Sequence, residues 1–366
     1  MRFPEFHGEW CISTIGEQFD LYSGNTPSRL NKAHFEGNVN WITSGELKEH
    51  YISDTKEKIS EVAATANNLK LLHPGTFVIA IYGLEADGVR GTGSITCKES
   101  TISQACMAFT QKGDVKNEFL YSWYKKHGNI IGIKYAQGTK QQNLSYDILE
   151  KFHIAYPSQD EQDKLIKFIS LLDERIATQS KLIEKLESLI KGIAQKIVRC
   201  NKPNVRLSEC LECKSSTLQE SDVYEQGTYP VYGANGIVGY LDNYNTESEA
   251  VYIIKDGSGV GTVSYVTGKC SATGTLNTLQ AKDGYSLQYF YYLLKVFNFE
   301  PYKTGMAIPH IYFKDYGNAL FFCPSYTEQL QYARLLFAID SKLSAEQNIK
   351  TNISLQKQYL LREMFI

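Results

Sequence analysis

The sequence has no apolar run that approaches the roughly 18 residues needed to span a membrane. Its opening, MRFPEFHGEW, also lacks the apolar core of a signal peptide. Eight cysteines are scattered through 366 residues, and this usage suits reduced thiols better than a disulfide framework. These absences argue against a membrane protein and predict a cytoplasmic location.

Motifs for three kinds of chemistry are missing as well. There is no Pro-Pro pair, so the N/D-P-P-Y/F loop of adenine methyltransferases is absent. The pair Gly268-Lys269 is followed by Cys270, so there is no G-x-x-x-x-G-K-[ST] loop for ATP. Cys210 and Cys213 have CxxC spacing, but no second pair of zinc ligands follows at a suitable distance. We therefore expect no catalytic residue, metal or cofactor on this chain. A small nuclease centre of carboxylates and a lysine is the alternative left open, because such clusters hardly constrain spacing.

An excess of positive charge is also lacking. The formal net charge is −2, and no segment of the chain forms a basic block. If the protein binds DNA, either its positive charge is gathered on one face or a partner supplies the phosphate contacts.

What the sequence does contain is one helix opening written twice. PSQDEQ at 157–162 and PSYTEQ at 324–329 lie 167 positions apart, and each precedes a periodic apolar segment. In each, Ser and Glu have the spacing of a capping box. In such a box the Ser oxygen accepts a hydrogen bond from the N3 amide, and the Glu carboxylate accepts one from the N-cap amide. Apolar residues then recur at spacings of three and four, which predicts long helices of coiled-coil type. The predicted seam consists of Leu165, Ile169, Leu172, Ile176, Ile183, Leu186 and Ile190 in the first helix and Leu336, Ile339 and Leu343 in the second.

Polar residues interrupt both seams. Gln179 occupies one seam position of the first helix, whereas Glu346 and Lys350 break the register of the second. Each helix should contain about 35 to 40 residues and span about 50 to 60 Å. An apolar stripe of this length can lie on its own domain or on the other helix. Two capped helices in equivalent places favour pairing with each other, and a compact domain between them makes the pair antiparallel.

The segments that precede the two helices also resemble each other. TFVIAIYG at 76–83 matches AVYIIKDG at 250–257, and GTGSI at 91–95 matches GVGTV at 259–263. The first copy is longer, chiefly near 46–70. We therefore predict duplicated, mixed α/β domains in tandem with two long antiparallel helices. The expected segments are a first domain at 1–158, a helix at 159–200, a second domain at 201–324 and a helix at 325–366.

The order of these features resembles the specificity subunit of type I DNA restriction-modification systems, over nearly the whole chain. The resemblance rests on RFPEFHGEW at the start, WITSGEL at 41–47, PGTFVIAIYG at 74–83, QQNLS at 141–145 and the duplicated P-S-x-x-E-Q openings. It implies two target-recognition domains, each reading half of a split sequence in double-stranded DNA. It also implies methyltransferase subunits, two being expected, and restriction subunits as partners, with S-adenosylmethionine, ATP and Mg bound by those partners. A noncatalytic scaffold whose domains bind peptide or glycan is the alternative.

Loops that look exposed are the candidates for reading DNA, at 43–46, 82–91 and 137–143 in the first domain and at 232–236, 255–259 and 304–310 in the second. Base edges are read by short polar side chains and by Arg, Lys, Asn and Gln, while Lys, Arg, Ser, Thr and backbone amides hold phosphates. The other interpretation of each residue is a solvated turn, and a His between Pro309 and Ile311 can simply be packed. We predict DNA contacts from Thr43, Ser44, Tyr82, Arg90, Lys140 and Gln141 in the first domain and from Tyr232, Asn235, Lys255, Ser258, Lys303 and His310 in the second.

Overall fold

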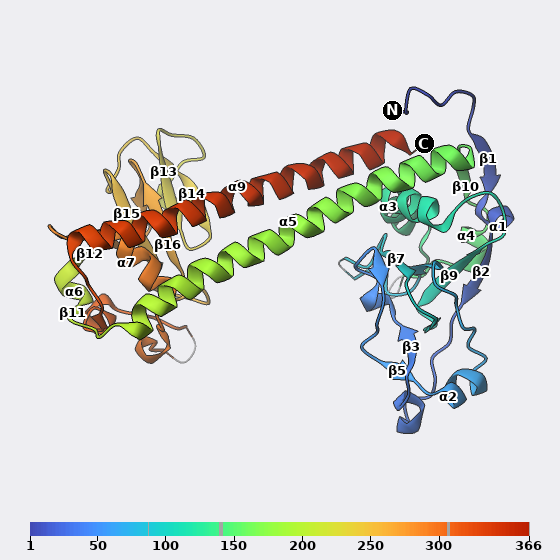
Figure 1. The fold of residues 1–366 in the computed structure, drawn as a ribbon, viewed down its shortest axis with the longest axis horizontal. Coiled ribbons are helices and arrows are strands. Elements are labelled where there is room, and N and C mark those ends of the chain that lie inside the picture. The colour runs from blue at the N-terminus through green and yellow to red at the C-terminus, as the bar shows by residue number, and fades with distance from the viewer. Residues whose placement is uncertain (87, 139–141, 306–307, 366) are drawn as a thin grey trace. The chain divides into compact units, whose positions relative to one another are not determined.

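The computed structural model describes residues 1–86, 88–138, 142–305 and 308–365, and its elements are labelled in Figure 1. The chain divides into two compact units. Unit 1 comprises Met1–Ala177 and Thr351–Ile366, and unit 2 comprises Thr178–Lys350. No helix in the described ranges combines the length and apolarity needed to cross a membrane.

Two long helices confirm the prediction from periodicity. They are α5 (Gln159–Cys200) and α9 (Tyr326–Met364), and each begins directly after the Ser of its predicted cap. A polar residue occupies the equivalent seam position in each helix. These residues, Gln179 and Glu346, are 167 positions apart and form a hydrogen bond in unit 2. Glu346 is buried and also contacts Lys342. The predicted break at Glu346 is therefore wrong, because the Gln179 amide and Lys342 satisfy its carboxylate within the seam.

The parts of α5 and α9 within each unit run antiparallel, as predicted. In unit 1, Leu165 near the start of α5 shares a core with Leu360 near the end of α9. In unit 2, Ile190 in the second half of α5 shares a core with Leu336 near the start of α9. Of the predicted seam, Leu165, Ile169, Ile183, Ile190, Leu336 and Leu343 are buried, whereas Leu172, Ile176, Leu186 and Ile339 are half-buried.

The two capping boxes differ from the predicted pattern. At the start of α5, the Glu161 amide donates to the Ser158 hydroxyl over 3.4 Å, but the Glu161 carboxylate turns to Arg2, with N–O distances of 2.7 and 2.6 Å. Glu161 is 1% exposed, so the two-pronged Arg2 contact gives a buried charge its partner. At the start of α9, Glu328 accepts from the Ser325 amide over 3.2 Å, as a capping box requires.

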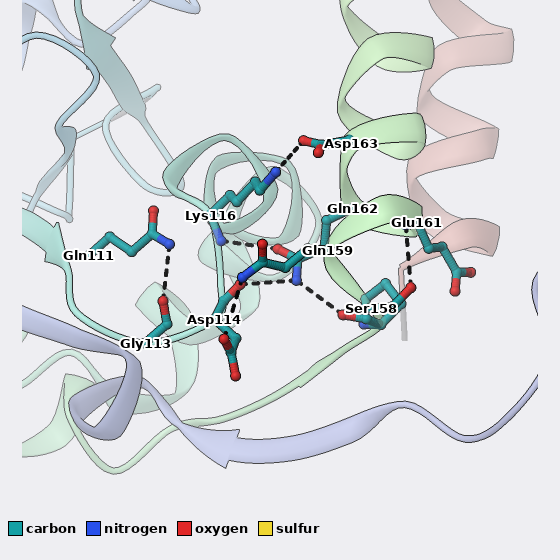
Figure 2. A network of polar contacts seen from close by, with 10 residues as sticks. Gln111, Gly113, Asp114, Lys116, Ser158, Gln159, Glu161, Gln162 and Asp163 are labelled. Carbon is teal, nitrogen blue, oxygen red and sulfur yellow. Dashed lines mark hydrogen bonds and ion pairs between the residues drawn. The ribbon is translucent and has the colours of Figure 1, made fainter.

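The last Gln of each P-S-x-x-E-Q motif ties a long helix to a domain helix. In unit 1, Gln162 Oε1 accepts from the Lys116 amide over 3.0 Å, and its Nε2 donates to the Pro157 carbonyl over 3.0 Å (Figure 2). In unit 2, Gln329 makes the same two contacts, with the Ser286 amide at 2.9 Å and the Pro324 carbonyl at 3.0 Å. Lys116 and Ser286 are the N-cap residues directly before the domain helices α3 (Asn117–Tyr135) and α7 (Leu287–Leu294).

Within its described residues, the domain of unit 1 contains two sheets and a β-ribbon, with α3 packed on the larger sheet. Two strand pairs are parallel, β4 (Tyr51–Ile52) with β7 (Gly93–Thr96) and β3 (Val39–Ile42) with β8 (Ser100–Ile102). The other strand pairs are antiparallel. The larger sheet has the order β2 (Phe19–Ser23), β9 (Cys106–Gln111), β6 (Phe77–Ala80), β7 (Gly93–Thr96), β4 (Tyr51–Ile52). The smaller sheet has the order β5 (Lys58–Ile59), β3 (Val39–Ile42), β8 (Ser100–Ile102), and the ribbon is β1 (Cys11–Thr14) with β10 (His153–Tyr156). Short helices are α1 (Ile15–Gln18), α2 (Glu61–Ala66) and α4 (Tyr146–Leu149).

The domain of unit 2 repeats this plan with fewer strands, and α7 takes the place of α3. Its larger sheet is antiparallel, with the order β12 (Leu211–Ser215), β18 (Leu276–Ala281), β15 (Glu249–Ile254), β16 (Val263–Thr267). Its smaller sheet has the order β14 (Gly236–Leu241), β13 (Tyr229–Gly233), β17 (Ser271–Ala272). The ribbon is β11 (Val205–Arg206) with β19 (Leu320–Phe321), and the short helices are α6 (Leu207–Cys210) and α8 (Phe313–Tyr316).

A histidine of unit 1 links β4 to α3 and to α5. The His50 ring stacks between the rings of Tyr51 and Tyr121, with centroid distances of 4.1 and 3.9 Å. Its Nε2 lies 2.8 Å from Glu118 Oε2 on α3, and its Nδ1 lies 3.4 Å from Asp173 Oδ2 on α5. The ring is thus held by two aromatic faces and two carboxylates.

The charges around His50 stabilise its protonated form. Burial by itself lowers the His50 pKa, but the Asp173 and Glu118 carboxylates outweigh burial, and the pKa is raised above its usual value. Burial by itself raises the pKa of Asp173, but contacts with His50 and Lys357 outweigh it, and that pKa is lowered. Lys357 Nζ lies 2.5 Å from Asp173 Oδ1.

We expect His50→Gln to destabilise unit 1 more at pH 5.5 than at pH 9. A raised histidine pKa contributes stability that is fully present below the unfolded pKa of about 6.5 and is lost as pH rises through the folded pKa. The lowered Asp173 pKa works at the other end, since its stabilisation is lost only as pH falls through the acidic range. Urea unfolding followed by tryptophan fluorescence measures this, because Trp10, Trp41 and Trp123 all lie in unit 1. His73→Gln, at a side chain that is 85% exposed, is the control. A pH-independent loss of stability in His50→Gln would contradict the expectation.

Candidate nucleic-acid interface

Two of the predicted loops in unit 1 start beside the same turn. The Ile42 carbonyl, at the end of β3, accepts from the Ser103 amide over 2.9 Å. The Ile81 amide, just after β6, donates to the Ala105 carbonyl over 2.9 Å. The loops that begin at Thr43 and Tyr82 therefore leave the domain at one end.

Unit 2 forms the corresponding end of its domain with equivalent backbone hydrogen bonds. The Tyr232 carbonyl in β13 accepts from the Thr273 amide over 2.9 Å, and the Lys255 amide after β15 donates to the Thr275 carbonyl over 3.0 Å. The predicted loops at 232–236 and 255–259 are thus the counterparts of those at 43–46 and 82–91.

The third predicted loop of each unit joins the second. In unit 1 a single β-bridge connects Tyr82 to Asn143, and the Gln142 amide donates to Glu85 Oε2 over 2.8 Å. This hydrogen bond is the chief reason why the pKa of Glu85 is lowered. In unit 2 a β-bridge connects Asp256 to His310, which are the counterparts of Tyr82 and Asn143. Each unit therefore presents a surface formed from three loops.

The predicted residues of unit 1 are placed differently on this surface. The Thr43 amide and hydroxyl both donate to Glu46, over 2.8 and 2.9 Å, so Thr43 holds its own turn, in which Ser44 is half-buried. Tyr82 lines a hollow of about 500 Å³ together with Gln137 and Asn143. Lys140 and Gln141 lie outside the described residues.

Arg90 holds two of these loops together. Its Nη2 donates to Gln142 Oε1 over 2.9 Å. Its buried Nε, like the buried Oδ1 of Asn143, has no hydrogen-bond partner among residues 1–86, 88–138, 142–305 and 308–365. Unpaired buried polar atoms are costly, so both are suited to receive a ligand's polar groups.

In unit 2, four of the predicted residues are exposed or half-buried. Asn235 is exposed at the turn between β13 and β14, where Gly236 adopts φ +104°, and Ser258 is exposed in its Gly-rich loop. Lys255 is half-buried at the end of β15. Tyr232 is half-buried, its ring lies 5.7 Å from that of Tyr252, and burial raises its pKa.

The two remaining predicted residues of unit 2 contact acids. Lys303 Nζ lies 2.6 Å from Glu300 Oε1, and His310 Nδ1 lies 2.6 Å from Asp256 Oδ1. His310 is thus a partner in an ion pair or hydrogen bond and not only a packed ring. These acids offset the basic groups, so this surface does not gather strong positive charge.

Sequence reasoning missed Asp256, Gln142 and Asn143, which join the loops. The signal was available in the duplication, because aligning the two copies places Asp256 opposite Tyr82 and His310 opposite Asn143. Gln142 lacks such a signal, since its role depends on the conformation of the loop that contains Arg90.

The fold and these paired surfaces define a tandem of two equivalent binding domains, each joined to long helices through the same Gln contacts. The chain belongs to the family of the type I restriction modification DNA specificity domain, whose model matches residues 7–188 and 202–355. Each match covers one domain and part of a long helix, which confirms the family resemblance inferred from the motifs.

Individual relatives agree with this assignment. The chain is 27% identical over 185 residues to the type I restriction enzyme MjaIX specificity subunit of Methanocaldococcus jannaschii, which is 50% of this chain but only 42% of that protein. It is 22% identical to the EcoprrI specificity subunit of Escherichia coli, over 91% of this chain and 88% of that one. The crystal structure of the type I restriction-modification S subunit from M. genitalium shares the fold, with a TM-score of 0.69, 19% identity and coverage of 100% and 99% of the two chains.

Proposed function

We propose that this chain is the DNA specificity subunit of a type I restriction-modification complex and that its two domains each read one half of a split target. The observation that carries the proposal is the duplicated three-loop surface, built by matching backbone bonds in a chain whose two halves both match the DNA specificity family. Loops on a rigid sheet are suited to reading base edges, because the scaffold fixes their position while their side chains vary.

The chemistry belongs to partner subunits. This chain positions them, with methyltransferase subunits bound along α5 and α9, one for each of the two equivalent units, and restriction subunits added to that assembly. S-adenosylmethionine, ATP and Mg bind to those partners and not to this chain. A solved structure that concerns complex assembly of the type I R-M system contains a chain with the same fold. Its TM-score is 0.58, with 15% identity and coverage of 98% of this chain and 97% of that one.

Most phosphate contacts come from the partners as well. The net charge of −2 and the acids beside Lys303 and His310 leave this chain with little positive charge for the DNA backbone. Specific binding by the complex should therefore show a steeper salt dependence than binding by this chain alone.

Co-expression with a methyltransferase subunit tests the function directly. Mapping methylated adenines across a genome should yield one motif with two defined halves and an undefined gap. Methylation of that motif when this chain is omitted would refute the proposal. The alternative of a scaffold for peptide or glycan has no support from the family match, and a salt-dependent DNA shift with the methyltransferase present would separate the two.

The purified chain alone should neither methylate nor cut DNA. Methylation should appear on addition of the methyltransferase subunit and S-adenosylmethionine, because the motif for methyl transfer is missing from this sequence. Radiolabel transfer from S-adenosylmethionine measures this, and a methyltransferase subunit incubated without this chain is the control. Robust transfer or cleavage by the chain alone would overturn the noncatalytic role.

A further inference from the structure

One short segment of unit 1 covers a sheet edge and also contacts a domain helix and a long helix. The segment His50–Ile52 contains β4, and its carbonyls accept from the outer edge of β7, with Ile95 N to His50 O and Cys97 N to Ile52 O both at 2.8 Å. The His50 side chain then reaches past Tyr121 of α3 to Asp173 of α5. The segment comes from the part of the first copy that is longer than the second.

Unit 2 has the same edge without a covering strand. Tyr265 of β16 pairs with Val251 as Ile95 pairs with Phe77 in unit 1, so β16 is the counterpart of β7. In the described part of the chain, β16 is the last strand of its sheet. The Ile254 amide donates to Thr262 O over 3.0 Å, so the backbone of Thr262 faces β15. Backbone groups in an antiparallel ladder alternate in direction, so those of Tyr265 and Thr267 face outward, away from β15. Such an open edge is a template for another strand.

Unit 2 has an open cleft at the end of α7, the helix whose Tyr291 contacts Tyr265 of β16. Its volume is about 480 Å³, and its lining includes Tyr292 and Lys295 near the end of α7, Ile190 of α5, and Asp340 and Ser344 of α9. Lys295 Nζ lies 5.3 Å from the ring of Tyr291, just as Lys125 Nζ lies 5.2 Å from Tyr121 in unit 1. The α7 residues that line the cleft thus adjoin the platform that His50 covers in unit 1.

The cleft contains a carboxylate that lacks a basic partner. Asp340 is the counterpart of Asp173, which contacts both His50 and Lys357. Ile190 stands 167 positions before Lys357 and takes its place in unit 2, and no basic side chain contacts Asp340 in the described ranges. Its contact is the Tyr292 hydroxyl, 3.2 Å away. Lys191, Lys295 and a second acid, Glu187, line the same cleft, so it is the local Asp340 carboxylate, and not the net charge of the cleft, that favours a basic group donating to it.

One difference between the units determines how that occupant enters. Tyr265 stands where unit 1 has Ile95, and its ring lies 5.4 Å from the ring of Tyr291. Tyr291 is the counterpart of Tyr121, on which His50 stacks in unit 1. In unit 2 the Tyr291 ring is therefore already in contact with the Tyr265 ring. The basic group is directed instead into the cleft at Asp340.

We propose that the outer edge of β16 and this cleft bind an extended segment of a partner protein, which adds a parallel strand to β16 and places a basic side chain beside Asp340. This inference goes beyond DNA recognition and does not depend on it. A small cation would satisfy Asp340 but would leave the edge of β16 open. An extended polypeptide satisfies both, as residues 50–52 do in unit 1.

The probe is a peptide with the sequence of residues 47–54, LKEHYISD, acetylated and amidated, with p-benzoylphenylalanine in place of its tyrosine. Photolysis with the full chain, followed by mass spectrometry, should give saturable labelling of β16 and α7 that excess unlabelled peptide suppresses. Replacing the peptide histidine with asparagine, or Asp340→Asn in the protein, should each reduce this labelling at least fivefold. The two changes together should reduce it little further, because both remove one contact.

A matched pair of variants isolates the strand pairing. Thr267 is the counterpart of Cys97, so Thr267→Pro removes an outward amide that bonds the added strand, whereas Thr267→Ala keeps it. Labelling of β16 should fall at least tenfold in Thr267→Pro and persist in Thr267→Ala, with circular dichroism confirming that both variants are folded. Equal labelling in the two variants overturns the proposal. So does labelling confined to β7, which would mean that the peptide only displaces β4, and so does the absence of saturable labelling in unit 2.

Discussion

Replacing residues 203–323 with the equivalent region of a related specificity subunit should change one half of the methylated sequence and leave the other half unaltered. Methylation at the original site should disappear completely, because under the proposed function both halves are required for recognition. The structure favours this exchange, since the segment begins and ends at neighbouring points. Asn204 exchanges two hydrogen bonds of 2.8 Å with Cys323, and β11 pairs with β19.

The mirrored exchange provides the control. Residues 11–156 begin and end on the paired strands β1 and β10, so this region can be replaced at equally close points. It should change the other half of the target. Methylated motifs mapped from cells that express each chimaera with the same methyltransferase decide the result. If either exchange alters both halves, the two domains are not independent readers.

The long helices were predictable because their signals are local. A cap followed by apolar residues at spacings of three and four specifies a helix without reference to the rest of the chain. The same local view failed at Glu346, because a polar residue in a seam can be distinguished from a break only when its partner is known. That partner, Gln179, lies 167 positions away.

Contacts between distant segments account for what sequence reasoning missed in the fold. Glu161 has the spacing of a capping box, yet its carboxylate contacts Arg2 at the other end of the domain sequence. The edge strand β4 has two residues, too short a segment for alternation to show. Its role depends on the outer edge of β7, which exists only after the sheet has formed.

The candidate interface was predictable in position but not in detail. Gly-rich and polar segments after strands indicated the correct loops, and matching backbone bonds bring those loops together in each unit. Which side chains face a ligand depends on competition within the loop, as when Thr43 caps its own turn or Lys303 contacts Glu300. The DNA contacts of the individual residues therefore stay predictions.

The junction between long helix and domain helix supports a final prediction. Gln162→Met keeps the side-chain volume but removes the acceptor for the Lys116 amide and the donor to the Pro157 and Asp114 carbonyls. Gln162 is fully buried, so these backbone groups lose a partner that water cannot readily replace. An unsatisfied buried group costs about 1 to 3 kcal/mol, and we expect unit 1 to lose about 2 to 4 kcal/mol of unfolding free energy.

A neighbouring glutamine separates this effect from a general cost of changing the helix start. Gln159 is exposed and reaches Asp114 only over 3.4 Å (Figure 2), so Gln159→Met should change stability by less than about 0.5 kcal/mol. Urea unfolding followed by tryptophan fluorescence compares the two, since all three tryptophans lie in unit 1. Gln329→Met should act likewise in unit 2, seen as faster amide exchange in α7, because Gln329 caps Ser286 as Gln162 caps Lys116. Equal stability of Gln162→Met and Gln159→Met would show that the repeated Gln does not hold the helix to the domain.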